Sequence, residues 1–214
     1  MSGQHRIVAI DGPAGSGKTT LARRLAAHFE LDFLDTGLLY RAVADRLIQA
    51  GVPLDDVAAA AAAAREVGAA DLASPRLRDE AVSQGASKVA AIPEVRQALL
   101  AFQRSFGNAG RGAVLVGRDI GTVVRPDADY KIYVTASLEE RAKRRCKELQ
   151  AAGVPTIYDR VLQELRQRDA RDRSRAVAPL VPAHDAFVID TTKRDVEAAF
   201  GIACAHVAGP ALRR

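Results

Sequence analysis

The sequence predicts an α/β fold built on a five-stranded parallel sheet that helices flank. Short apolar runs, which indicate buried strands, alternate with longer segments of helical spacing, and this alternation is typical of βαβ units. A glycine-rich loop at residues 12–20 lies between the first strand and the first helix. The chain has 214 residues, of which 48% are hydrophobic, so it can form one such domain with small insertions.

Five short apolar runs are expected to form the strands. They are residues 6–11, 33–35, 113–116, 131–135 and 187–190. Four helices are expected to follow strands, at residues 18–30, 38–50, 138–152 and 196–208. Because crossover connections carry helices to both faces of a parallel sheet, these strands should be buried on both sides.

A first insertion interrupts this alternation at residues 52–108. The stretch contains no convincing strand and includes an alanine run at 58–64, which favours a helix. Residues 87–106 then carry apolar side chains at helical spacing. The positions concerned are Val89, Ile92, Val95, Leu99, Phe102 and Phe106.

A second insertion follows at residues 153–180, where an apolar stripe precedes a dense group of charges. The stripe consists of Ile157, Val161, Leu162 and Leu165, and Pro179 and Pro182 should stop the helix. The core is then expected to comprise residues 1–51, 109–152 and 181–214. Since the insertions follow the second and fourth strands, we expect them to be mobile lobes that close over a site at the carboxyl edge of the sheet.

The glycine-rich loop fits the pattern G-x-x-x-x-G-K-[ST]. Gly12 and Gly17 allow the backbone to wrap closely around an anion, and the loop N–H groups and the helix N-terminus direct partial positive charge toward it. Lys18 should reach the β- and γ-phosphates of ATP, and the Thr19 hydroxyl should hold Mg²⁺. The less favoured alternative is a strand-to-helix turn without a ligand. The expected ATP-binding residues are Gly12, Pro13, Ala14, Gly15, Ser16, Gly17, Lys18, Thr19 and Thr20.

Composition narrows the classes of function. The net charge of +5 fits either a nucleic acid or a small polyanionic substrate. Cys146 and Cys204 lie far apart without metal-ligand spacing, so we expect two reduced thiols. No secretory leader and no apolar run of membrane-spanning length is recognisable, and nothing demands more than a monomer. We therefore expect a monomeric cytoplasmic protein that does not bind a membrane. Convergence of the basic groups on one site, described next, would exclude a nucleic acid as its partner.

Five arginines crowd into residues 166–175. At helical spacing Arg168, Asp172 and Arg175 share one face, which offers two cations and one acceptor to a phosphate and a sugar hydroxyl. A solvated helix face is the ordinary explanation for such a charge run. The repeated choice of arginine, whose fork matches phosphate geometry, favours the binding role.

Two further basic segments follow the ends of predicted strands. Arg118 and Asp119 come after the third strand, and Tyr40 and Arg41 come soon after the second. The alternative roles are a local ion pair for Arg118 with Asp119, and ordinary helix-surface positions for Tyr40 and Arg41. Ligands of parallel sheets bind at the carboxyl ends of strands, so the basic groups should converge beside the phosphate loop. Such convergence indicates phosphoryl transfer between two phosphorylated ligands.

At this point the sequence resembles the bacterial cytidylate kinases, a family of nucleoside monophosphate kinases with the P-loop kinase fold. The matching segments span nearly the whole chain and are IDGPAGSGKTT, LDTGLLYRAVA, ASKVAAIPEVRQALLAFQR, GRDIGTVVRPDA, KIYVTAS with EER, and RQRDARDRSRAVAPLVPA. The resemblance implies transfer of a phosphoryl group from ATP to CMP or dCMP, with Mg²⁺, to give ADP and CDP or dCDP.

The resemblance also implies roles for individual residues. Ser87, Arg96 and Asp119 would contact the cytosine ring, with Arg175 nearby. Asp172, together with Arg168, would reach the pentose hydroxyls. The catalytic set would be Lys18, Arg41, Arg118 and Arg168, and Thr36 and Tyr40 would line the acceptor pocket. Asp119 could accept a hydrogen bond from the cytosine amino group, whereas uracil would present an oxygen there, so we expect CMP and dCMP to be preferred over UMP.

The sequence departs from the family pattern in two places. Val116 stands where many members carry an acidic residue two positions before the arginine of the GRD segment, which here is Arg118. The resemblance implies that residues 52–108 are a monophosphate-binding lobe and residues 153–180 a lid. Many members carry a small three-stranded insert in this lobe, but residues 66–86 are too short and too poor in β-branched residues to form it. The monophosphate-binding lobe should therefore be mainly helical.

Other functions remain open at this stage. A P-loop kinase for a different small phosphate acceptor would share most of these features. A GTPase is disfavoured because residues 192–195 only faintly resemble [NT]-K-x-D and no D-x-x-G occurs. A nucleic-acid-binding module is supported by the basic composition alone.

Overall fold

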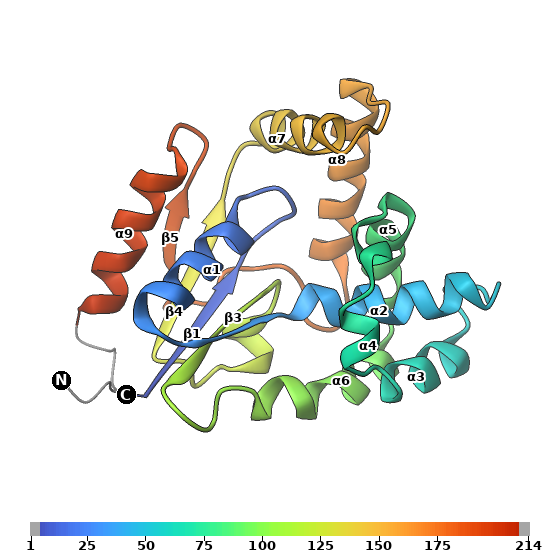
Figure 1. Cartoon of the computed structure of the whole chain (residues 1–214), viewed down its shortest axis with the longest axis horizontal. Helices are drawn as coiled ribbons and strands as arrows, with labels where there is room; N and C mark the ends of the chain where they lie inside the picture. Colours follow the sequence, from blue (N-terminus) through green and yellow to red (C-terminus); the bar gives the residue numbers. More distant parts are fainter. Residues whose placement is uncertain (1–4, 210–214) are drawn as a thin grey trace.

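The computed structural model describes residues 5–209 and contains a parallel sheet with strand order β2-β3-β1-β4-β5 (Figure 1). The strands are β1 (Arg6–Asp11), β2 (Asp32–Asp35), β3 (Gly112–Gly117), β4 (Tyr130–Thr135) and β5 (Phe187–Asp190). All neighbouring strands pair in parallel. The prediction of a five-stranded parallel sheet is therefore confirmed. The outermost parts of the predicted core, residues 1–4 and 210–214, lie outside the described residues.

Four helices follow strands of the sheet, close to the predicted positions. They are α1 (Lys18–Phe29), α2 (Thr36–Gln49), α7 (Leu138–Ala151) and α9 (Val196–Ala208). Side chains cap three of them, because Asp35, Ser137 and Asp195 each accept a hydrogen bond from a backbone N–H of the first helical turn. The predicted boundaries of the four helices differ from the observed ones by at most two residues.

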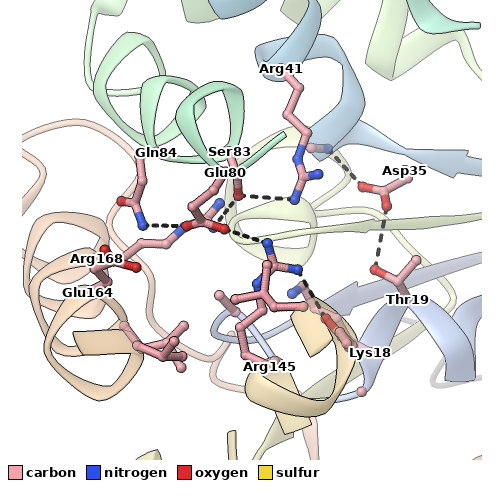
Figure 2. A pocket seen from close by; sticks show the side chains of 18 of the residues that line it. Lys18, Thr19, Asp35, Arg41, Glu80, Ser83, Gln84, Arg145, Glu164 and Arg168 are labelled. Carbon is pink, nitrogen blue, oxygen red and sulfur yellow. Dashed lines mark hydrogen bonds and ion pairs between the residues drawn. The ribbon is translucent and has the colours of Figure 1, made fainter. Parts of the chain in front are cut away.

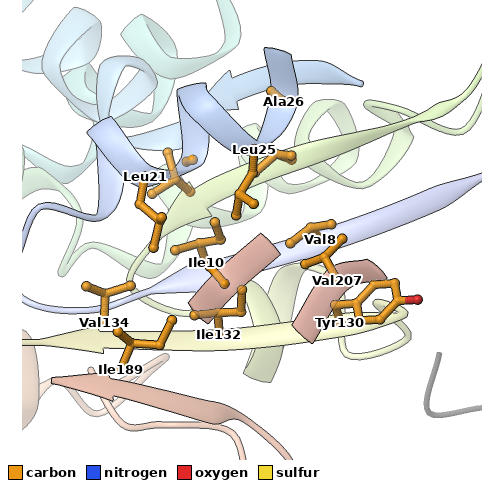
Figure 3. Packing of buried hydrophobic residues seen from close by; sticks show 14 of the residues in the cluster. Val8, Ile10, Leu21, Leu25, Ala26, Tyr130, Ile132, Val134, Ile189 and Val207 are labelled. Carbon is orange, nitrogen blue, oxygen red and sulfur yellow. The ribbon is translucent and has the colours of Figure 1, made fainter. Parts of the chain in front are cut away.

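The apolar strands bury both of their faces. Val8 and Ile10 of β1 pack with Leu25 of α1 and Val207 of α9 on one side of the sheet (Figure 3). The alternate residues Ile7 and Ala9 pack on the other side, in a cluster that includes Ile120 and Val124. This two-sided burial fixes the register, and the register in turn sets where each strand ends.

The first insertion is mainly helical and contains no strand among its residues, as expected. It contains α3 (Val57–Arg65), α4 (Ala69–Leu72), the 3₁₀ turn η1 (Pro75–Arg78), α5 (Glu80–Val89) and α6 (Pro93–Ser105). The expected continuous helical spacing over residues 87–106 is divided, because Pro93 begins α6 and disfavours helical backbone at the preceding residue. Phe102 is also 48% exposed, so the apolar series is not wholly in the core.

The second insertion forms α8 (Tyr158–Ser174), which packs against α7. Val161 and Leu165 of the expected stripe are buried against Ala142 and Cys146 of α7, but Ile157 precedes the helix and is 69% exposed. The helix ends at Ser174, before the prolines that were expected to stop it. Cys146 and Cys204 are both free thiols.

No helix within residues 5–209 has the length and apolar character needed to cross a membrane.

The α1–sheet interface predicts a stability effect. Leu25 is fully buried, so Leu25→Ala should lower the free energy of unfolding by about 2–5 kcal/mol through lost burial and the cavity left behind. Denaturant titration followed by circular dichroism measures this change. Val188→Ala is the control, since Val188 is 54% exposed and should change stability by less than about 0.5 kcal/mol. Equal effects of the two substitutions would contradict the packing described.

Candidate active site

The glycine-rich loop connects β1 to α1 in a conformation that requires its glycines. Gly12, Gly15 and Gly17 have φ values of +150°, +74° and +84°, where other residues are strained. A Cβ at Gly12 would lie 2.0 Å from the Val134 carbonyl oxygen of β4. The loop is therefore held tightly against the sheet, with the N-terminus of α1 directly behind it.

Lys18 lies at the first position of α1 and is buried. Its Nζ donates a hydrogen bond to the carbonyl of Pro13, 3.1 Å away, within the same loop. Burial, and then the positive charge of Arg118, lower the pKa of Lys18 well below its usual value. A bound polyanion would oppose both effects and stabilise the ammonium form.

A cavity of about 390 Å³ opens beside the loop (Figure 2). Its walls come from the glycine-rich loop, α1, α2, α5, α7 and α8, and Arg118 lies at the end of β3. The loop contributes six of the nine predicted residues, namely Ala14, Gly15, Gly17, Lys18, Thr19 and Thr20. Gly12, Pro13 and Ser16 do not line it, and the Ser16 carbonyl instead accepts a hydrogen bond from the Thr191 hydroxyl.

A second cavity, of about 50 Å³, adjoins the first. Gly37, Arg118 and Arg168 line both cavities, so these residues form their common wall. All ten predicted acceptor residues line one cavity or both: Thr36, Tyr40, Arg41, Ser87, Arg96, Arg118, Asp119, Arg168, Asp172 and Arg175. The structure therefore brings together residues that the sequence separates by up to 139 positions, from Thr36 to Arg175.

Three arginines from different elements surround the junction of the cavities. Arg41 of α2 donates to the Leu77 carbonyl at 2.6 Å and to the Ser83 hydroxyl at 3.3 Å, and Arg168 of α8 donates to the same hydroxyl at 3.0 Å. Burial, together with the nearby Arg118, lowers the pKa of Arg168, although a guanidinium remains charged at neutral pH. The Nε of Arg168 is buried without a protein partner. This arrangement favours an anion.

Asp172 is the counter-charge of this cationic cluster. Its carboxylate accepts hydrogen bonds from Ser87 Oγ at 2.9 Å and from Arg118 Nε at 3.1 Å, and it also pairs with Arg175. Burial alone would raise the pKa of Asp172, but Arg118 and Arg175 hold it below the usual value. Arg168, Asp172 and Arg175 all line the smaller cavity, as expected, although Arg175 follows the last residue of α8 and is not on its helical face.

Asp119 and Arg96, which both line the smaller cavity, form a buried ion pair. Burial raises the pKa of Asp119, while Arg96 opposes that rise. The guanidinium carbon of Arg96 also lies 5.6 Å from the centre of the Tyr40 ring. The alternative of a local Arg118–Asp119 ion pair is thus not what forms, because Arg118 pairs with Asp172 and Asp119 pairs with Arg96.

Sequence reasoning gave no role to several cavity-lining residues. Glu80 and Gln84 of α5 hydrogen-bond to each other, and Glu80 pairs with Arg145 of α7 across the larger cavity (Figure 2). The Ser83 hydroxyl accepts hydrogen bonds from both Arg41 and Arg168. These α5 residues precede Ser87 at helical spacing, so extending the Ser87 face by two turns would have found them.

Asp35 was also given no role from the sequence. It caps α2, where its carboxylate accepts from Gly37 N at 3.0 Å, and its other oxygen lies 3.5 Å from Thr19 Oγ1. Asp35 follows the pattern of polar groups at strand ends, which is the signal that could have identified it.

Val116 leaves no gap in this region despite its departure from the family pattern. Its side chain is buried, and its carbonyl accepts a hydrogen bond from Thr36 Oγ1 at 3.0 Å. The backbone of β3 therefore anchors the start of α2 directly beside Arg118.

Asp11, the last residue of β1, ties the glycine-rich loop to the segment after Asp119. Its two carboxylate oxygens accept hydrogen bonds from the backbone N–H groups of Ile120 and Gly121, both at 2.8 Å. Burial raises the pKa of Asp11 to about 7, although these two hydrogen bonds oppose the rise. The carboxylate thereby fixes where Asp119 sits relative to the loop.

Comparison with known proteins points to one family. The family model described as cytidylate kinase matches residues 8–204. A cytidylate kinase of Paramagnetospirillum magneticum is 58% identical over 200 residues, which cover 92% of this chain and 95% of that protein. One from Methylocella silvestris is 59% identical over 194 residues, covering 91% and 90%. A solved structure of an uncharacterized protein from Eubacterium ventriosum shares the fold, with a TM-score of 0.57, 17% identity and coverage of 96% and 99%.

The raised pKa of Asp11 predicts a pH-dependent stability difference. In the folded state Asp11 is protonated up to about pH 7, whereas in the unfolded chain it ionises near pH 4. Between these values the folded state binds more protons, so the stability of the wild type relative to Asp11→Asn should fall as pH rises, by up to about 4 kcal/mol. Urea denaturation between pH 4.5 and 8 measures the difference.

The exposed Asp55→Asn controls for the loss of one carboxylate. A difference between wild type and Asp11→Asn that stays constant, or rises, across this pH range would contradict the assignment to Asp11.

Proposed function

The chain belongs to the cytidylate kinase family, and from this membership we infer that it transfers the γ-phosphoryl group of ATP to CMP or dCMP. The products are ADP and CDP or dCDP. The observation that carries the assignment is the pair of adjoining cavities, one beside the phosphate-binding loop and one containing the Asp119–Arg96 pair, with Arg118 and Arg168 on their common wall. Two nucleotides bound in these cavities would meet phosphate to phosphate.

We propose that the larger cavity binds ATP. Backbone N–H groups of residues 14–20 would surround the β- and γ-phosphates, and Lys18 at the start of α1 would neutralise them. Binding of the phosphates would offset the desolvation that lowers the pKa of Lys18.

Transfer requires an oxygen of the CMP phosphate to attack the γ-phosphorus in line with the bond that breaks to the β-phosphate oxygen of ATP. The protein supplies positioning and charge neutralisation, with no covalent intermediate. Arg41, Arg118 and Arg168 converge where the two phosphates would meet. We propose that they bind the acceptor phosphate and stabilise the charge on the migrating group, as an arrangement of preorganised donors does.

The smaller cavity is proposed to bind the nucleoside part of CMP. Asp119 would accept a hydrogen bond from the cytosine amino group, while Arg96 and Ser87 would donate to the ring oxygen and nitrogen. Asp172 and Arg168 would contact the pentose hydroxyls, with Arg175 nearby and Thr36 and Tyr40 along the wall. Ser87 and Arg96 now bond to Asp172 and Asp119, so binding would exchange protein partners for nucleotide partners.

Mg²⁺ is proposed as the metal of the reaction. Thr19 Oγ1 and the Asp35 carboxylate lie 3.5 Å apart on the wall of the larger cavity, and both offer the oxygen ligands that Mg²⁺ prefers. Mg²⁺ bound there would neutralise charge on the ATP phosphates. No cluster of three or more histidine, cysteine or acidic side chains suited to a metal occurs among residues 5–209, which fits an ion that substrate phosphates help to hold.

Residues 52–108 are proposed as the monophosphate-binding lobe and residues 153–180 as the lid. We also propose that the protein acts as a monomer in the cytoplasm. A coupled assay of ATP with CMP, dCMP, UMP and AMP tests the function, and gel filtration with light scattering tests the monomer. Faster phosphorylation of AMP or UMP than of CMP and dCMP would favour a kinase for another acceptor.

The proposed role of Asp119 predicts a change in acceptor specificity. Asp119→Ala should lower kcat/KM for CMP by about 10- to 200-fold, because it removes the acceptor for the cytosine amino group, and should lower kcat/KM for UMP much less. Steady-state kinetics with both nucleotides measure the ratio. Asp127→Ala, an exposed aspartate on the segment before β4, is the control and should leave the ratio unchanged. An Asp119→Ala enzyme with the wild-type preference would contradict base recognition by this residue.

The proposed role of Arg168 predicts a loss in turnover. Arg168→Ala should lower kcat by about 10²- to 10³-fold, because a cation that stabilises the transferring phosphoryl group is removed. Arg166→Ala is a matched control two residues away on α8, where the side chain is exposed, and its kcat should stay within about twofold of wild type. Similar kcat losses for the two variants would indicate a general charge effect and contradict a specific role for Arg168.

A further inference from the structure

Arg141, near the start of α7, contacts the phosphate-binding loop although it lines neither cavity. Its side chain is buried, with 4% exposed. Nη1 donates to the carbonyl oxygen of Ala14 at 3.1 Å, and Nε donates to the carbonyl oxygen of Ala136 at 3.0 Å. One guanidinium group therefore joins the loop to the turn that follows β4.

The same guanidinium also binds α8. Nη1 and Nη2 donate to the two carboxylate oxygens of Asp169, at 3.1 and 2.6 Å, in a bidentate ion pair. Asp169 is also buried, and it lies between Arg168 and Asp172 on the helix that carries both toward the acceptor cavity. A continuous set of polar contacts thus runs from the donor loop through Arg141 and Asp169 to the acceptor-binding residues of α8.

Backbone packing makes this connection tight. A Cβ at Gly15 would lie 3.2 Å from Arg141 Cβ and 3.3 Å from the Arg141 carbonyl oxygen. The tip of the loop therefore rests directly on the first turn of α7, and a shift of that turn would displace the loop. Arg141 therefore packs against Gly15 and also donates a hydrogen bond to the neighbouring Ala14 carbonyl.

We propose that Arg141 and Asp169 are positioning residues that set α8, and with it Arg168, against the phosphate-binding loop. This inference rests on the proposed function, in which the loop holds ATP and Arg168 acts on the transferring group. Neither residue touches the reacting atoms. Their contribution is the distance and orientation between donor phosphates and Arg168, which in-line transfer requires.

The choice of residue types supports positioning rather than stability. A buried ion pair often adds little stability compared with apolar residues of similar volume. It does, however, specify one geometry, because a planar guanidinium must meet two carbonyl oxygens and a carboxylate in fixed directions. A lysine would keep the charge but would not make all four hydrogen bonds.

The test compares Arg141→Lys and Asp169→Asn with wild type. Both should lower kcat about 10- to 100-fold, because Arg168 is displaced. KM for CMP should rise by a smaller factor, because Asp172 moves on the same helix while the base-binding residues Asp119 and Arg96 do not. Melting temperatures establish that the variants are folded. Arg24→Lys is the matched control: Arg24 forms a bidentate pair with Glu197 between α1 and α9, and its kcat should be unchanged.

A double-mutant cycle separates positioning from general destabilisation. If Arg141 and Asp169 act through Arg168, then Arg168→Ala should reduce kcat far less in the Asp169→Asn background than in wild type. Losses that simply multiply would overturn the proposal, as would a folded Arg141→Lys or Asp169→Asn enzyme with kcat within twofold of wild type.

A milder variant keeps the proposal testable if Asp169→Asn does not fold. Asp169→Glu retains the charge but moves the carboxylate by one methylene, so it should fold and still lower kcat about fivefold or more, and a wild-type kcat would overturn the proposal. All effects are measured with the acceptor that the wild type phosphorylates best. A wild type that prefers an acceptor other than CMP or dCMP contradicts the proposed function, whereas the Arg141–Asp169 inference is judged from the same variants with that acceptor.

Discussion

Repulsion among closely placed cations is the constraint on which the active site depends. Lys18, Arg41, Arg118 and Arg168 come from four elements and gather around one cavity. Charges of one sign in a poorly solvated site repel strongly, so carboxylates and phosphates must hold such a group together. Asp172 supplies part of that counter-charge from the protein itself, through its contacts with Arg118 and Arg175. The phosphates of the two proposed nucleotides would supply the remaining counter-charge.

The parallel sheet makes this concentration of charge possible. Asp11, Asp35 and Gly117 end adjacent strands at nearly the same level, because Asp11 pairs with Gly117 and Asp35 with Val116 in the register. Whatever follows these strands is therefore delivered to one edge: the phosphate loop, the start of α2, and the Arg118–Asp119 segment. Hydrogen bonds then hold these three segments together. The Asp11 carboxylate accepts from the N–H groups of Ile120 and Gly121, and the Thr36 hydroxyl donates to the Val116 carbonyl.

Most of this architecture could be predicted from the sequence because it depends on local signals. Strand and helix boundaries follow from apolar periodicity and caps, and the phosphate loop from its glycines and Lys18. The family resemblance named the ten acceptor residues that the structure gathers. Pairings between distant residues, such as Ser87 with Asp172 and Arg96 with Asp119, had no local signal, since they depend on how α5, α6 and α8 pack. Arg141 was missed for the same reason, because only its contacts with Ala14 and Asp169 reveal its role. Asp35 and Glu80 did carry signals, from the end of a strand and from the helix face of Ser87.

The contacts that α5 makes with α7 and α8 differ in strength from the Arg141–Asp169 contact between α7 and α8. Glu80 with Arg145, and Gln84 with Arg171, join α5 to α7 and α8 through partly exposed side chains, and such contacts contribute little free energy. The Arg141–Asp169 pair, which joins α7 to α8 and the loop, is buried and bidentate. A kinase must exclude water during transfer and release its products afterwards. The weak contacts would break readily if the first insertion moved away from the α7–α8 pair, whereas the buried pair would hold Asp169 and its neighbour Arg168 close to the phosphate loop.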